Sequence, residues 1–327
     1  MRKVSRSIQK RIRFAGKKVR LLYTAAVLAA VLLGAAVLGE NGYLSIDLPG
    51  WLGEFTQPYQ PVAQLTGEEV AAVHFIDVGQ GDSVLIQAGE AAVLIDAGER
   101  DQGQKVCEYL KAAGVQQLDL VIATHPHSDH IGGLPDVIEQ FPVEEILMPD
   151  LPDEMVPTTA VFQRLVESVE QQQIPVTAAS AGMEYPLAEG VCLTVLAPLE
   201  PEEDLNNVSV VCRLDCGANS FLFCGDAEEP VEEALLDSAA QVKAQVLKAG
   251  HHGSNTSSSG AFLDAVSPSI AVISCGQGND YGHPHREVLD RLSQRAVTVY
   301  RTDQDGTVVL TSDGQSIAVQ TETGGAQ

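Results

Sequence analysis

Three histidines and one aspartate fall within six residues, in the segment 124–130 that reads Thr-His-Pro-His-Ser-Asp-His. His125 and His127 are two residues apart, so both imidazoles can turn to one side, and Asp129 and His130 follow on the next bend. Neutral imidazoles with a carboxylate suit zinc and related divalent ions. Two such ions together can polarise an ester and hold a hydroxide. We therefore predict that these four side chains bind catalytic metal.

The chain must hold this group at the end of a strand. Residues 118–123 form a short apolar run typical of a buried strand, and they end directly before the histidine segment. Asp96, Asp226 and His251 likewise follow apolar runs that predict strands. Taken singly, Asp96 could cap a turn, Asp226 could cap a helix and His251 could be a loop residue. Their shared position after strands indicates one common site.

The body of the chain alternates between short apolar strands and helical segments from about residue 72 onward. Predicted strands cover 73–78, 84–88, 91–95, 118–123, 145–148, 191–196, 208–214, 220–224, 242–248, 270–274, 297–301 and 307–311. Predicted helices cover 105–113, 133–140, 158–172, 230–238, 261–265 and 286–294. This mixture predicts an α/β sandwich of sheets covered by helices. The six cysteines form no CxxC pair, so we expect buried free thiols, with a disulfide among Cys212, Cys216 and Cys224 as the alternative.

The first 70 residues differ in composition from the rest. Residues 1–20 hold nine basic residues and no acidic one, and residues 21–38 carry no charge. The uncharged run is near the lower length for crossing a bilayer, and basic residues stay on the cytoplasmic side. A signal peptide cut near Gly39 is the alternative to an uncleaved anchor. We predict a single-pass protein of the cell membrane with a basic cytoplasmic segment (1–20), a transmembrane signal anchor (21–39), a tether (40–70) and an extracytoplasmic domain (71–327).

The charge of the chain limits what it can bind. The net charge is −24, and after the basic segment 11 basic residues stand against 44 acidic ones, or −33. Nonspecific binding of a nucleic-acid backbone needs Lys and Arg. The composition therefore argues against tight nonspecific DNA binding, whereas small nucleotides and short oligonucleotides stay compatible because bound metal would offset charge at the site.

The pattern His-x-His-x-Asp-His after a hydrophobic strand resembles the signature of the metallo-β-lactamase superfamily, over residues 72–315. The resemblance implies a four-layer αββα sandwich and a hydrolase with two divalent metal ions. It also implies that Asp96 braces the histidine loop, that Asp226 bridges the metals and that His251 is the last ligand. The family usually supplies a third His to the first metal, but no His lies between the signature and His251. Asn207 is expected there as a weak ligand, and because Asn suits a harder ion, Mn²⁺ is an alternative to Zn²⁺.

Four segments are similar to the C-terminal metal-dependent domain of the ComEC competence (DNA-uptake) proteins. They are residues 74–83, 206–209, 247–254 and 281–284. The resemblance implies a nuclease or phosphodiesterase that acts through a metal-bound hydroxide. In addition to binding metal, Asp129 would orient this hydroxide, while His252 and His283 would contact the phosphate or the leaving group. Asp77 and Asp82 would shape the rim of the site. With one predicted span, the chain is not expected to conduct DNA itself.

Two other functions are compatible with the same residues. A two-metal site can also attack a carbonyl, so a hydrolase of carboxylic esters, lactones or β-lactams is the second hypothesis. A non-enzymatic binding module is the third, because a fold does not decide function. The expected partners are the membrane, through the N-terminal helix, and nucleic acid or a small phosphodiester as substrate. The sequence indicates no protein partner.

Overall fold

The structure is a computed structural model that describes residues 69–199, 204–238 and 240–324. The chain divides into two units, residues 1–58 and 59–327, and all described residues belong to the second. The predicted anchor (21–39) and nearly all of the predicted tether (40–70) therefore lie outside the described residues. Within the described ranges, no helix is long and apolar enough to cross a membrane.

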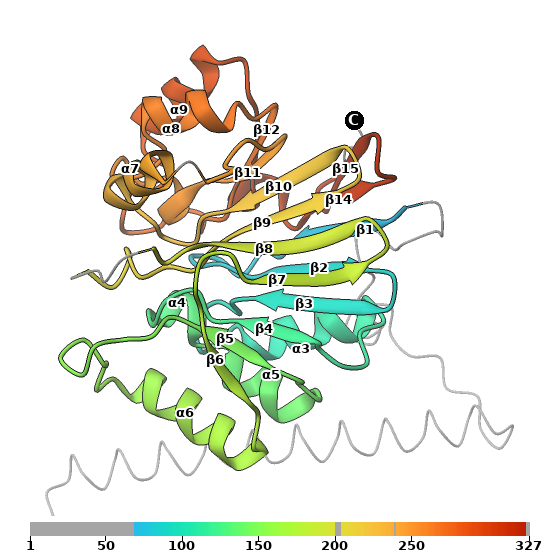
Figure 1. Cartoon of the computed structure of the whole chain (residues 1–327), viewed down its shortest axis with the longest axis vertical. Helices are drawn as coiled ribbons and strands as arrows, with labels where there is room; N and C mark the ends of the chain where they lie inside the picture. The colour runs from blue at the N-terminus through green and yellow to red at the C-terminus, as the bar shows by residue number, and fades with distance from the viewer. Residues whose placement is uncertain (1–68, 200–203, 239, 325–327) are drawn as a thin grey trace, which may run out of the picture. The chain divides into compact units, whose positions relative to one another are not determined.

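The first of two sheets has eight strands in the order β15-β14-β1-β2-β3-β4-β5-β6 (Figure 1). Strands β3 to β6 run parallel to one another, and the other neighbours are antiparallel. Parallel neighbours need a crossover, and helices between these strands supply it. The strands are β1 (Ala71–Phe75), β2 (Val84–Ala88), β3 (Ala91–Ile95), β4 (Leu120–Ile122), β5 (Ile146–Met148), β6 (Val176–Ala178), β14 (Val308–Ser312) and β15 (Ile317–Thr321).

The second sheet has seven strands in the order β13-β12-β11-β10-β9-β8-β7. Its β7 to β10 part is antiparallel, whereas β10 to β13 are parallel. The strands are β7 (Glu184–Ala188), β8 (Val191–Ala197), β9 (Val211–Cys216), β10 (Asn219–Phe223), β11 (Val246–Lys248), β12 (Ile270–Ile273) and β13 (Thr298–Arg301).

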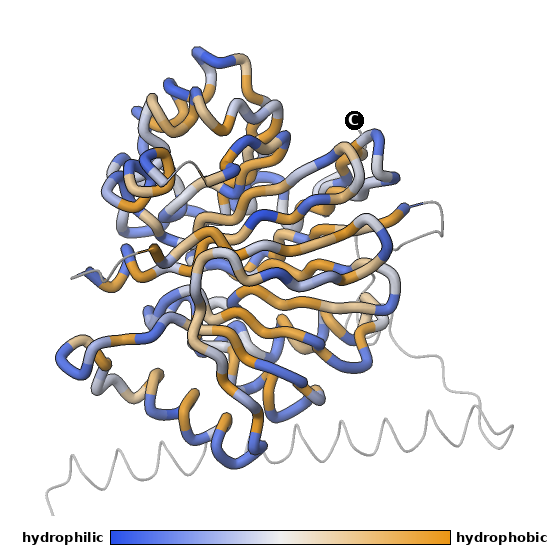
Figure 2. The backbone as a smooth tube through the Cα atoms, in the orientation of Figure 1, coloured by the Kyte–Doolittle hydropathy of each residue, from blue (hydrophilic) through white to orange (hydrophobic). Residues whose placement is uncertain are grey.

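The two sheets pack against each other through alternate residues of their strands. Val73 and Phe75 of β1 share one core cluster with Phe221 and Phe223 of β10, and the rings of Phe75 and Phe223 lie 6.2 Å apart. Side chains alternate between the faces of a strand, so one set fills this core and the other meets the helices. Figure 2 shows the hydrophobic residues concentrated along the strands.

Helices cover the outer face of each sheet. The first sheet packs against α3 (Gly103–Ala112), α5 (Leu134–Gln140) and α6 (Ala160–Gln172), and the second against α7 (Glu229–Asp237), α8 (Gly260–Val266) and α9 (Arg286–Gln294). The described residues also form three short helices, namely α4 (Ser128–Ile131), the 3-10 helix η1 (Gly250–Gly253) and α10 (Thr302–Asp305). The predicted mixed α/β fold with two sheets is confirmed. All six cysteines are unpaired and five are buried, as expected for free thiols.

Candidate metal centre

Four strands of the two sheets end close to one another, and the candidate site residues directly follow these strands. Asp96 follows β3, the histidine segment follows β4, Asp226 follows β10, and the turn with His251 and His252 follows β11. Carboxyl ends of neighbouring parallel strands lie at one edge of a sheet, which is where α/β folds place their sites. The residues that sequence spacing grouped together are therefore brought to one edge.

Asp96 stabilises the histidine segment (residues 124–130) through hydrogen bonds. It is fully buried and has a positive φ of 57°. Its carboxylate accepts hydrogen bonds from Thr124 N at 2.9 Å, from Thr124 Oγ1 at 2.6 Å and from His130 Nδ1 at 2.8 Å. Because Nδ1 of His130 donates to Asp96, Nε2 is the nitrogen of this ring that faces the site and would bind a metal ion once deprotonated.

One group of possible ligands, here called the Asp129 group, contains Asp129, His130, Asp226 and His252. The Nε2 atom of His252 lies 3.3 Å from Nε2 of His130, 3.3 Å from Asp129 Oδ2 and 3.5 Å from Asp226 Oδ2. Asp226 Oδ1 lies 3.2 Å from His130 Nε2. Two imidazoles and two carboxylates so close together form a donor set that suits a divalent ion.

His252 and His251 differ in how they face this group, although both adopt a positive φ. His252 is buried and donates from Nδ1 to the carbonyl of Ser274 at 3.0 Å, which leaves Nε2 free to face the carboxylates. His251 donates from Nδ1 to Glu228 Oε1 at 3.0 Å, and its Nε2 atom lies 3.8 Å from Asp226. The geometry favours His252 over His251 as a ligand in the Asp129 group, with His251 in the wall beside it.

A second group, the His125 group, contains His125, His127 and Asp226. His125 Nε2 lies 3.1 Å from His127 Nδ1 and 3.7 Å from Asp226 Oδ2. The hydroxyl of Thr124 donates to Asp96 and so accepts from His125 Nδ1, at 3.1 Å. The proton on Nδ1 leaves a lone pair on His125 Nε2. Burial, together with the nearby imidazole of His130, holds the pKa of His125 well below its usual value, so its ring is neutral.

A buried ion pair lies behind the Asp129 group. The ammonium of Lys248, at the end of β11, pairs with Asp82, and both side chains are almost fully buried. Asp82 Oδ1 lies 3.4 Å from His252 Nδ1. Asp82 is therefore buried instead of lying at the rim, and its carboxylate belongs, with His130, Asp226 and His252, to a cluster that could hold a metal ion. Asp77 is half-buried, caps Gly79 N and pairs with Lys105 outside the cleft.

The carboxylates and imidazoles of the two groups shift one another's pKa values. Burial alone would lower the pKa of His252, but Asp226 and Asp82 overcome it and raise this pKa to about 9. Burial also opposes protonation of His130, whose pKa Asp226 and Asp96 nevertheless hold well above its usual value. For Asp226, burial favours the neutral acid, but the neighbouring imidazoles keep its pKa well below the usual value. These carboxylates therefore stay ionised and attract cations.

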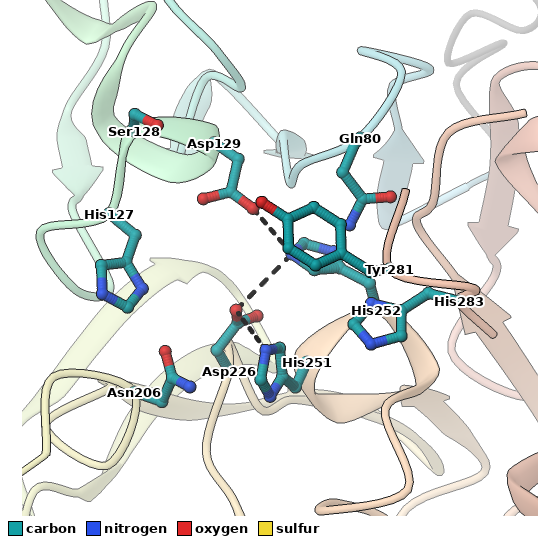
Figure 3. A pocket seen from close by; sticks show the side chains of 10 residues that line it. All are labelled: Gln80, His127, Ser128, Asp129, Asn206, Asp226, His251, His252, Tyr281 and His283. Atoms are coloured by element: carbon teal, nitrogen blue, oxygen red, sulfur yellow. Dashed lines mark ion pairs between the residues drawn. The ribbon is translucent and has the colours of Figure 1, made fainter. Parts of the chain in front are cut away.

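Both groups lie at the base of a cleft of about 300 Å³ (Figure 3). Tyr281 at its mouth is 66% exposed and stacks on His283, with ring centroids 5.6 Å apart. Burial and the neighbouring His252 lower the pKa of His283 to about 4, so its ring is neutral at pH 7. The cleft is lined by Gln80, His127, Ser128, Asp129, Asn206, Asp226, His251, His252, Tyr281 and His283.

Residues 76–277, more than half of the chain, match the family described as the metallo-beta-lactamase superfamily. The chain belongs to this superfamily. Membership confirms the expected class, a metal-dependent hydrolase, and agrees with a cluster of four side chains that could hold a metal ion, namely Asp82, His130, Asp226 and His252.

Competence proteins are among the relatives of this metallo-β-lactamase-fold chain. It is 31% identical to ComE operon protein 3 of Bacillus subtilis, over 72% of this chain and 32% of the relative. It is 34% identical to competence protein ComA of Neisseria gonorrhoeae, over 88% of this chain and 38% of the relative. It is also 27% identical to hydroxyacylglutathione hydrolase of Vibrio parahaemolyticus, over 56% of this chain and 66% of the relative. The likeness to competence proteins is confirmed, and the chain spans about a third of their length.

Several site residues escaped the sequence reasoning. Asn207, expected as a weak ligand, instead accepts from the backbone N of Glu228 at 3.1 Å, and its neighbour Asn206 lines the cleft. Gln80 and Tyr281 also line the cleft and lie within motifs that resemble competence proteins, but neither had been given a role. The adjacent Asn206 and Asn207 were the sequence feature that could have indicated this residue. Spacing alone does not tell which of two adjacent amides faces a site.

Proposed function

We propose that this chain hydrolyses phosphodiester bonds, in single-stranded nucleic acid or small phosphodiesters, with two divalent ions held at the base of the cleft. The observation that carries the proposal is Asp226, whose carboxylate lies within 3.8 Å of four imidazoles, three from the two groups and that of His251 beside them. One carboxylate shared in this way is what a two-metal centre needs. The sequence resemblance to ComEC competence (DNA-uptake) proteins, which implies a nuclease or phosphodiesterase, is our reason for preferring phosphodiesters to other esters.

The side chains fit divalent ions. Asp226 Oδ1 is buried and has no hydrogen-bond partner within the described residues, so an acceptor oxygen is left for a cation. The Asp129 group would hold one ion and the His125 group the other. Bound ions of this kind supply Lewis acidity and lower the pKa of water. The mixed oxygen and nitrogen donors are compatible with Zn²⁺ and with Mn²⁺.

The residues of the cleft supply orientation and proton transfer. Asp129 is partly exposed to the cleft, and its carboxylate can accept a proton from an attacking water and orient it. His251 presents its Nε2 side at the cleft wall while Glu228 fixes the ring. His283 is neutral and lies beside Tyr281, where it can hydrogen-bond the phosphate or the leaving group.

Tyr281 supports a substrate that carries a nucleobase. Its ring is the most exposed large hydrophobic side chain among the described residues, and it lies at the mouth of the cleft. The loop beneath it is rigid, since Asn279 bonds both Gly276 O and the backbone of His283. Stacking of a base on an aromatic ring contributes about 1–3 kcal/mol. A fixed, exposed ring beside the metal centre is therefore suited to a single-stranded substrate.

The test is metal-dependent turnover. The full chain is assayed with single-stranded DNA and bis-p-nitrophenyl phosphate in Mn²⁺ or Zn²⁺, beside a His127→Ala variant. Cleavage that needs metal and is lost in the variant supports the proposal. Bound metal without phosphodiester cleavage, but with turnover of a lactone, a thioester or nitrocefin, replaces it with the carbonyl hydrolase that the hydroxyacylglutathione hydrolase relative favours. Absence of both metal and turnover leaves a binding module.

We further propose that residues 21–39 anchor the chain in the cell membrane with the hydrolase domain outside the cytoplasm. The uncharged run after nine basic residues supports this orientation. Protease added to intact cells should remove the hydrolase domain, whereas protection until lysis would place the domain inside.

A further inference from the structure

Asn206 has a side chain whose oxygen is left without a partner. Its Nδ2 atom donates to Glu228 Oε1 at 3.3 Å, and a carboxylate oxygen only accepts, which fixes which end of the amide is nitrogen. The other end, Oδ1, is buried and has no hydrogen-bond partner within the described ranges. A buried acceptor without a partner lowers the stability of the fold. An oxygen held in this way is suited to a cation.

The orphan oxygen belongs to the same cleft as the His125 group. Asn206, His127 and Asp226 all line it, and Figure 3 shows the amide between the His127 ring and the Asp226 carboxylate. The turn that carries Asn206 is fixed, because its backbone N donates to Asp204 Oδ1 at 2.8 Å. Asn207 is not among the residues that line the cleft, and its oxygen already accepts from the backbone N of Glu228.

We infer that Asn206 Oδ1 is a ligand of the cation held by His125, His127 and Asp226, in the position where the superfamily usually has a third His. This inference rests on the proposed two-metal function. Two imidazoles with two oxygens form a harder donor set than three imidazoles with one oxygen. The exchange of nitrogen for oxygen shifts the His125 group toward Mn²⁺, while the Asp129 group keeps its own four donors.

The test is metal binding by the full chain, stripped of metal and titrated with Mn²⁺ and with Zn²⁺ by calorimetry, with Mn²⁺ electron paramagnetic resonance as a second readout. The wild-type chain is expected to bind two Mn²⁺. In Asn206→Leu, which matches the size of Asn and removes the oxygen, the second Mn²⁺ should bind about 10- to 100-fold more weakly, while the first is unchanged. In Asn206→His, the same site should prefer Zn²⁺ by about tenfold more than the wild type does.

The control is Asp204→Asn, which can keep an acceptor for the Asn206 backbone and leaves the amide oxygen in place. It should bind both Mn²⁺ ions as the wild type does. Two Mn²⁺ ions bound with unchanged affinity in Asn206→Leu would overturn the inference, as would a wild-type chain that binds one ion in the Asp129 group. If Asn206→Leu does not fold, unchanged Mn²⁺ and Zn²⁺ preference in Asn206→His decides against the inference. A wild-type chain that binds neither metal overturns the proposed function itself.

Discussion

Replacing Asp96 by Asn tests whether the brace below the histidines prepares the metal centre. Asn keeps the size of Asp and tolerates the positive φ of 57°, so backbone strain does not confuse the result. The amide can still accept from Thr124 N with its oxygen, but its NH₂ then faces Thr124 Oγ1 and His130 Nδ1. The NH₂ group of Asn is a donor, so it cannot accept the hydrogen bond that His130 Nδ1 donates to the Asp96 carboxylate.

The size of the effect follows from what His130 must do. To avoid the clash, His130 loses its Nδ1 proton and carries the proton on Nε2, the atom that should bind metal. Loss of such a supporting hydrogen bond typically weakens metal binding about 10- to 100-fold. At 25 °C this corresponds to about 1.4–2.7 kcal/mol of binding free energy. The effect should be larger in the Asp129 group, because His130 bonds Asp96 directly, whereas His125 is linked to Asp96 only through Thr124 and also has Ser209 Oγ 3.3 Å from its Nδ1 atom.

The assay is competition for Mn²⁺ or Zn²⁺ with a chromophoric chelator, at equal protein concentration. The matched control is Asp119→Asn, because Asp119 also accepts a backbone hydrogen bond, from Ala92 N at 2.8 Å, but lies just before β4 rather than after it. The control should bind metal as the wild type does. An Asp96→Asn variant that is folded by circular dichroism and binds metal with wild-type affinity would refute the role of the brace.

Three further predictions concern the ligands, the protons and the substrate. His252→Ala should abolish metal binding in the Asp129 group, whereas His251→Ala should weaken it less than about tenfold; equal losses in equilibrium dialysis would contradict the geometry. Because the pKa of His252 is raised to about 9, this ring is protonated at pH 7, so metal binding should release about one proton or more and tighten as pH rises to 9. Calorimetry in buffers of different ionisation enthalpy counts these protons, and a count of zero would be incompatible with His252 as a ligand. Tyr281→Ala should raise KM about tenfold or more for a short single-stranded oligonucleotide and leave KM unchanged for one with an abasic site at the stacking position; loss of kcat on both would point to a structural role.

The fold could be predicted from sequence where the apolar runs are long and regular. Helix α9 has the predicted bounds of 286–294, and β3 the predicted 91–95. The prediction missed three strands, namely β6 and β15, whose residues are mostly exposed or half-buried, and β7, in which Glu, Tyr and Pro in succession give no apolar run. All three are edge strands, at the ends of their sheets. Edge strands bury fewer side chains, so hydrophobic periodicity indicates them poorly.

At the candidate site, sequence reasoning and structure differ mainly in the turns that follow the strands. Strand ends are visible in sequence, and they led to Asp96, Asp226 and the histidine segment. The turns after them are not regular. His251 and His252 both have a left-handed φ, so which imidazole enters the cluster depends on the path of a turn rather than on spacing. For the same reason, spacing did not indicate that Asn206, rather than Asn207, lines the cleft.

The acidic charge of the chain after residue 20 and the residues that line the cleft both limit how a phosphate could bind. Among the described residues, the cleft is lined by neither Lys nor Arg, and the buried ammonium of Lys248 is already paired with Asp82. In the proposed function, the positive charge that meets a phosphate would therefore come from the bound ions. Contacts that release counterions would make binding steeply salt-dependent, and the residues that line this cleft include no Lys or Arg to make them. Affinity would then depend on the metal ions and on the Tyr281 ring, which would favour short single-stranded substrates, since a body of −33 repels the rest of a long one.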